Sequence, residues 1–195
     1  MRDGTARLEL KRPDPSDQAT VSALWTVMSD PRTWTHLPRA CPTESSWLID
    51  YLTDQRSAWE TVGLGWWVVH LKDSHAGLPP GSVIGMGGVS PCRTVSAAWN
   101  LGYRLSPAVW GMGLGTELAE AGLRAAHEQA AEVPVTARVL ERNPASWRVL
   151  DKIGLTHVWS GEVPADDELT SGVARRIYAD RPLDSTLLDQ LIALG

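Results

Sequence analysis

The feature that most constrains this chain is a glycine-rich loop between a strand-like run and a helix-like run. The loop reads Trp110-Gly-Met-Gly-Leu-Gly-Thr-Glu117; the strand-like run precedes it at residues 98–105, and the helix-like run follows at 118–130. Glycines let the backbone approach a ligand closely and adopt a positive φ. The first N–H groups of a helix have no partner within it, and the helix dipole adds partial positive charge there. This arrangement predicts a phosphate cradle, and therefore an anionic cofactor.

Composition limits the classes of partner. A chain of 195 residues, of which 43% are hydrophobic and 21% charged, can build one well-packed domain. The net charge of −5 argues against a nucleic-acid partner, because phosphate binding needs a basic face, and it leaves room for a cationic substrate such as an amine. Cys41 and Cys92 are too few for a disulfide framework or a metal site, which predicts reduced thiols in a cytoplasmic protein. The longest apolar run, near residues 65–69, is too short to span a membrane.

Hydrophobic periodicity and turn residues predict a mixed fold. Strands are expected at 5–11, 65–71, 83–89, 95–105, 134–140, 156–163 and 173–178, and helices at 14–29, 43–59, 118–130, 143–154 and 185–194. The order of these elements indicates an α/β or α+β sheet in a single domain. We expect that domain to cover residues 1–195, with a core over about 5–183 and a C-terminal tail helix over 184–195.

Capping residues suggest where several helices begin. Pro15 suits the first turn of the first helix, and Thr43 is a candidate N-cap for the second. Asn143 is a favoured N-cap, and Pro144 after it is preorganised for the first helical position. Ser185 is the candidate N-cap of the last helix.

Four segments together resemble the GNAT superfamily of acetyl-coenzyme A-dependent N-acetyltransferases, and within it the RimJ/RimL-like branch of ribosomal-protein N-terminal acetyltransferases. Residues 101–107 resemble the strand before the cofactor loop, and residues 110–117 resemble the pyrophosphate loop. Residues 143–155 resemble the second cofactor-side helix, and residues 34–38 an N-terminal element of this branch. The glycine loop alone is a weak signal, since it also fits simple turn and packing glycines, but its combination with the 143–155 segment is specific.

The resemblance implies a mixed, largely antiparallel sheet of about seven strands with a splayed parallel pair, flanked by helices. Residues 102–106 and 135–140 would form the splayed pair, and the pantetheine arm of acetyl-CoA, as co-substrate, would bond to the backbone exposed between them. The Leu105 N–H would point at the thioester carbonyl and stabilise the oxyanion. The cofactor-binding residues implied are Tyr103, Leu105, Trp110, Gly111, Met112, Gly113, Leu114, Gly115, Thr116, Asn143 and Ser146.

The same resemblance implies direct attack of the amine on the thioester, so that only proton transfers need side chains. Many superfamily members protonate the leaving thiolate with a tyrosine, but that position here is Leu150. Ser146 is the catalytic acid that the RimL-like pattern suggests, although a serine in a first helical turn is also commonly structural. The glutamate expected as a base on the strand is Asn100 here. The titratable candidates left nearby in the sequence are Glu141, His157 and Glu162.

The acceptor end is less specified. Its wall would come from residues 25–59 and the closing hairpin, 162–173. The acidic residues Asp166, Asp167 and Glu168 in that hairpin favour a cationic amine. A protein N-terminus and a small amine both remain open as acceptors, and a homodimer is possible. The alternative function is a non-catalytic acyl-CoA-binding or regulatory module on the same fold.

Other charged residues have structural interpretations. Glu117 would stabilise the first turn of its helix through the helix dipole. Arg175 and Arg176 are predicted to be a solvent-exposed pair on a strand. We interpret His36 as a loop residue or a residue at the edge of the substrate site, and not as a base.

Overall fold

The computed structural model describes residues 4–92, 95, 98–162 and 172–194. Its centre is a seven-stranded sheet of order β1-β2-β3-β4-β5-β7-β6. All neighbouring strands pair antiparallel except β4 and β5, which pair parallel. The predicted mixed, largely antiparallel sheet with one parallel pair is confirmed. The strands are β1 (Leu8–Lys11), β2 (Trp66–Leu71), β3 (Val83–Pro91), β4 (Trp99–Leu105), β5 (Val135–Leu140), β6 (Thr156–Glu162) and β7 (Ala174–Ala179).

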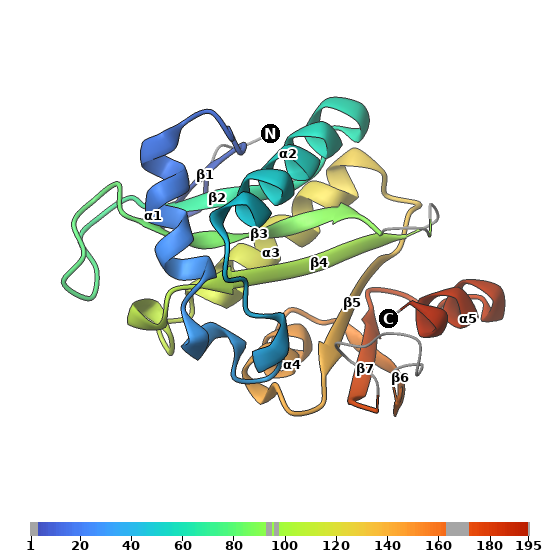
Figure 1. Cartoon of the computed structure of the whole chain (residues 1–195). Coiled ribbons are helices and arrows are strands. Elements are labelled where there is room, and N and C mark those ends of the chain that lie inside the picture. The colour runs from blue at the N-terminus through green and yellow to red at the C-terminus, as the bar shows by residue number, and fades with distance from the viewer. Residues whose placement is uncertain (1–3, 93–94, 96–97, 163–171, 195) are drawn as a thin grey trace.

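Helices cover both faces of this sheet. Figure 1 shows α1 (Gln18–Met28) and α2 (Ser45–Val62) on one face and α3 (Leu114–Gln129) on the other. The remaining helices are the short 3-10 turns η1 (Pro31–Trp34), η2 (Pro38–Ala40) and η3 (Pro107–Val109), together with α4 (Pro144–Lys152) and α5 (Ser185–Ala193). No helix in the described part of the chain is long and apolar enough to cross a lipid bilayer.

The N-terminal helices begin later than the sequence indicated. The Asp17 carboxylate accepts hydrogen bonds from the Thr20 N–H at 3.2 Å and the Thr20 hydroxyl at 2.7 Å, so α1 starts at Gln18. Pro15 therefore precedes the helix and does not lie in its first turn. The N-cap of α2 is Glu44, with no side-chain cap, and the Thr43 prediction is wrong.

The C-terminal helix is part of the core. Leu187 and Leu191 of α5 are buried in a cluster with Cys92 and Ile177. Arg175 is only 3% exposed, and its guanidinium donates to the carbonyls of Leu191, Ile192 and Leu194. The expectation of a solvated Arg175 is wrong, because this side chain satisfies the free carbonyls at the end of α5. The N-cap of α5 is Asp184, not Ser185.

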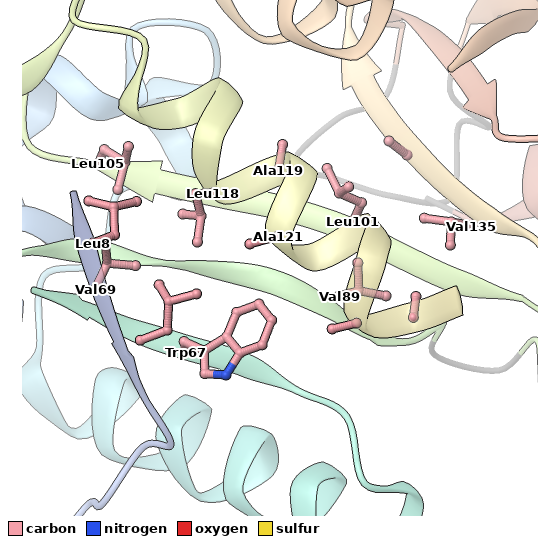
Figure 2. Packing of buried hydrophobic residues seen from close by; sticks show 14 of the residues in the cluster. Leu8, Trp67, Val69, Val89, Leu101, Leu105, Leu118, Ala119, Ala121 and Val135 are labelled. Atoms are coloured by element: carbon pink, nitrogen blue, oxygen red, sulfur yellow. The ribbon is translucent and has the colours of Figure 1, made fainter. Parts of the chain in front are cut away.

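The largest core cluster lies between α3 and the sheet. Figure 2 shows Leu118, Ala119 and Ala121 of α3 beside Val89 and Leu101 of the strands. The helix lies close to β3, since a Cβ added at Gly122 would meet the Val89 side chain at 3.2 Å. Dense packing of this kind fixes the start of α3 relative to the end of β4.

Candidate active site

The parallel pair separates after two residue pairs. β4 and β5 share only the registers Trp99↔Val135 and Asn100↔Thr136. At this junction the buried Thr136 hydroxyl donates to the Trp99 carbonyl at 2.8 Å. Beyond it, β4 pairs with β3 up to Leu105 and β5 pairs with β7 up to Leu140. The two strands therefore leave an opening between them, which we call the splay.

Hydrogen-bond alternation shows which groups of β4 face the splay. The Ser106 N–H donates to β3 at Ile84, whereas the Trp99 N–H donates in the opposite direction, to Pro134 before β5. Because backbone groups alternate along a strand, the odd-numbered amides of β4 point toward β5. The last paired position, Asn100↔Thr136, takes up the Leu101 N–H, so the amides that face the splay are those of Tyr103 and Leu105.

One of these gap-facing groups already has a partner. The indole N–H of Trp110 donates to the Leu105 carbonyl at 2.9 Å, and the Trp110 ring is 51% exposed. The amides left without a strand partner suit a ligand that carries amides of its own, since an unpaired buried amide is costly. These are the Tyr103 and Leu105 amides that the sequence resemblance named.

The glycine loop leaves the start of α3 free for an anion. Gly111 and Gly113 both have φ of +76°, which favours glycine. Gly113 is the N-cap of α3 and has no side chain, so it caps none of the first N–H groups, those of Leu114, Gly115 and Thr116. A Cβ at Gly115 would lie 3.4 Å from the Tyr103 ring, which places this helix start directly beside β4. The geometry fits a diphosphate.

An arginine of the N-terminal segment supports this loop. Arg7 donates through Nε to Glu117 Oε2 at 2.6 Å and through Nη1 to the Met112 carbonyl at 2.9 Å. Burial raises the pKa of Glu117, but hydrogen bonds from Thr5 and Arg7 outweigh it and hold that pKa below its ordinary value. Arg7 therefore neutralises the one acidic residue in the first turn of α3, where a free carboxylate would repel a phosphate. Sequence reasoning missed Arg7, because no local pattern joins it to Glu117.

The start of α4 brings two hydroxyl groups together. The Asn143 side chain accepts from the Ser146 N–H at 3.3 Å, so Asn143 is the N-cap that the sequence predicted. The Tyr103 hydroxyl is buried and has no hydrogen-bond partner among the described residues. Burial raises the pKa of Tyr103 to about 12, and the nearby Ser146 hydroxyl partly offsets this. The fold therefore places the Ser146 side chain close to the buried Tyr103 hydroxyl.

The predicted bases lie elsewhere. Glu141 is exposed and forms an ion pair with Arg176 of β7, and hydrogen bonds from Arg176 lower the pKa of Glu141. His157 and Glu162 are on β6, which β7 and β5 separate from the splay. Asn100 occupies the last paired position of β4. Among the described residues, the base candidates named from the sequence do not converge on the splay.

A short segment spans the splay on the face opposite α3. Arg104 of β4 donates to the Thr33 carbonyl, and Arg142, which follows β5, donates through Nε to the His36 carbonyl at 2.5 Å. We call Thr33–His36 the bridging segment, because it joins the two separated strands. It belongs to the predicted acceptor wall at 25–59. The acidic residues 166–168 of the other predicted wall lie outside the described residues.

Solved structures share this architecture. An acetyltransferase (GNAT family) from Bacillus anthracis is 16% identical, with 92% of this chain and 97% of that chain covered at a TM-score of 0.71. RimL, a ribosomal L7/L12 alpha-N-protein acetyltransferase solved with coenzyme A, is 16% identical, with 93% and 97% covered at 0.69. The protein yncA from Salmonella typhimurium, solved with its cofactor acetyl-CoA, is 15% identical, with 91% of this chain and 96% of that chain covered at a TM-score of 0.64. At these identities the likeness shows the fold.

The sequence itself carries the family. A search of curated proteins finds no match. The family model described as the acetyltransferase (GNAT) domain matches residues 7–156, which include the glycine loop, both separated strands and α4. This chain belongs to the GNAT acetyltransferase family.

Proposed function

We propose that this protein is an N-acetyltransferase that moves an acetyl group from acetyl-CoA to a primary amine in a ternary complex. The observation that carries the proposal is the splay: backbone amides of β4 face it without strand partners, and the uncapped start of α3 lies beside it. A ligand with a diphosphate and a chain of amides satisfies both features. Acetyl-CoA is such a ligand, and when bound it supplies the thioester that the amine attacks.

The chain's own groups would bind, orient and move protons. The first N–H groups of α3 would hold the diphosphate, with Gly111 and Gly113 keeping the loop open. The amides of Tyr103 and Leu105 would hold the pantetheine arm, and the Leu105 N–H would stabilise the oxyanion. Ser146 would protonate the leaving thiolate, a role that its place beside the buried Tyr103 hydroxyl supports.

The acceptor amine must lose a proton before or during attack, since free amines are mostly protonated at neutral pH. With the sequence-predicted bases placed away from the splay, we propose that water carries this proton out. The acceptor is a protein N-terminus or a small amine, cationic before reaction. We propose a cationic acceptor because the acidic residues Asp166, Asp167 and Glu168 would attract one. We also propose a cytoplasmic location, consistent with Cys41 and Cys92 as free thiols.

An acetylation assay tests this function. Purified protein is incubated with acetyl-CoA and a panel of peptides with free N-termini, amino acids and polyamines, and products are identified by mass spectrometry. We expect an acetylated amine together with stoichiometric free coenzyme A. Acetyl-CoA binding without acetyl transfer to any amine would contradict the proposal and support the non-catalytic alternative.

A further inference from the structure

The side chains of β4 divide between the two faces of the sheet. Tyr103 packs toward α3, since its ring lies beside Gly115. The even-numbered positions face α1 and α2: Gly102 lies under the Trp66 ring, and the Arg104 guanidinium lies 3.4 Å from the Trp34 ring centroid. Arg104 is therefore on the face that the bridging segment covers, next to the splay.

A second cation lies on the other side of the same segment. Arg142 lines an open hollow with a volume of ≈ 330 Å³, together with Glu141 and residues 172–174. Glu141 is paired with Arg176, through Nε at 2.7 Å and also through Nη2, so its charge is compensated. Within the part of the chain that the structure describes, no carboxylate forms an ion pair with Arg142 at this hollow.

Both arginines have donors to spare. A guanidinium carries five N–H groups, and Arg104 and Arg142 each have one hydrogen bond to the bridging segment. No described carboxylate forms an ion pair with Arg104 either. Holding the half-buried Arg104 cation without a counter-ion is costly, and the cost falls when an anion binds.

The charges of both arginines also affect the pKa of the histidine between them, His36. His36 is half-buried, and its carbonyl accepts from Arg142. Burial first, and then the charges of Arg104 and Arg142, lower the pKa of His36 to about 4. Burial also lowers the pKa of Arg104, to about 10, so Arg104 is still a cation at neutral pH. We call Arg104 and Arg142, with the neutral His36 between them, the cationic patch.

We propose that the cationic patch binds a carboxylate of the acceptor, so that the acceptor is an amine that also carries an acid group. This inference rests on the proposed function and names the acceptor class more closely. Guanidinium groups pair with carboxylates in a two-bond geometry that neutral amides cannot reproduce. An amino acid offers such a group at its α-carbon, and a peptide offers one in an acidic side chain near its N-terminus.

Matched acceptor pairs test the proposal. Amino acids with a primary α-amine are compared with their amides, and peptides beginning Ser-Asp with peptides beginning Ser-Asn, so that size is nearly constant and a carboxylate is replaced by a neutral amide. We expect the acid member of the preferred pair to have a kcat/KM about ten-fold higher than the neutral member. The amino acid pairs report an α-carboxylate and the peptide pairs an acidic side chain. The comparison is conservative, because the weaker base in each amino acid pair is the amide, which presents more free amine.

Two substitutions locate the effect. Arg104→Gln and Arg142→Gln should each lower kcat/KM for the acid member by at least about five-fold and leave the neutral member nearly unchanged. Arg142 has an exposed side chain, so its variant keeps the test valid if Arg104→Gln fails to fold. The matched control is Arg12→Gln, whose arginine lies over Trp59 near the distant strand β1. The control should match the wild type with both members.

The outcomes separate the two claims. Acetylation of the neutral members at an equal or higher rate overturns the carboxylate site and leaves the proposed function intact. An acid preference that both arginine variants retain also overturns the site. Product from no member of the panel overturns the proposed function and this inference together.

Discussion

The two sides of the splay are built in different ways. The cofactor side, formed by residues 101–117, presents mainly backbone: the free N–H groups of α3, two glycines with φ of +76°, and alternate amides of β4. The acceptor side, formed by the bridging segment and its neighbours, presents side chains: Arg104, Arg142, His36 and the Trp34 ring. Under the proposed function, backbone would recognise groups common to every coenzyme A thioester, whereas side chains would choose among amines. The comparison teaches that cofactor binding and acceptor choice can change independently in this chain.

The strongest test of this comparison is a substitution that affects only the proposed cofactor side. Gly113→Glu places an anion and a Cβ at a position with φ of +76°, where the diphosphate should bind. We expect acetyl-CoA affinity to fall at least about a hundred-fold, or about 2.7 kcal/mol, by calorimetry.

The chain offers a matched control for that change. Gly77→Glu carries the same substitution at φ of +78°, in a loop where a Cβ meets nothing within 4 Å. It should reproduce the backbone strain and retain acetyl-CoA affinity. Equal losses in the two folded variants would show that strain, and not the phosphate site, causes the effect.

The acceptor side is tested by pH. His36 is neutral in both folded and unfolded chains at pH 7. As the pH falls through 6.5 the unfolded chain takes up a proton at this residue, while the folded chain resists until about pH 4. Stability is therefore lost between these two values, by up to about 2 kcal/mol at pH 4.5 after allowing for partial exposure.

Urea unfolding at pH 7 and at pH 4.5 measures this loss. The His36→Gln variant lacks the titrating group and should lose less stability than the wild type over the same interval. Identical losses in the two proteins would mean that His36 is not in the positive environment described above.

A smaller effect is expected where the two sides meet. Ser146→Ala should lower kcat by at least about ten-fold and leave acetyl-CoA affinity nearly unchanged, if Ser146 is the acid. Tyr103→Phe removes a buried hydroxyl without a described partner, so it should not reduce the melting temperature, and any fall in its kcat would report chemistry. Unchanged turnover in a stable Ser146→Ala protein would leave this serine a structural residue of α4.

Much of the cofactor side could be predicted because its determinants are local. Gly113 and Asn143 each lie directly before the helix that they begin, so the local sequence identifies both. The Asn143 cap is confirmed by its bond to the Ser146 amide. The family resemblance supplied the separated strands, which no local pattern contains.

The acceptor side could not be predicted because its contacts are distant in the chain. Arg104 meets Thr33 across 71 residues, and Arg142 meets His36 across 106. In the sequence, Arg104 occupies a strand position typical of an exposed residue. Only the structure, in which the Trp34 ring lies over its guanidinium, shows that this side chain is half-buried. The same reason hid Arg7, whose partner Glu117 is 110 residues away.

The central claim is that the splay between β4 and β5 holds acetyl-CoA through alternate backbone amides, and amide hydrogen exchange of β4 by NMR tests it directly. The N–H groups of Tyr103 and Leu105 face the splay, whereas those of Gly102 and Arg104 are bonded within the β3–β4 ladder. We predict that saturating acetyl-CoA slows exchange at amides of the first group and leaves the second group unchanged. Unchanged exchange at both Tyr103 and Leu105, or protection confined to the even-numbered amides, would contradict the account.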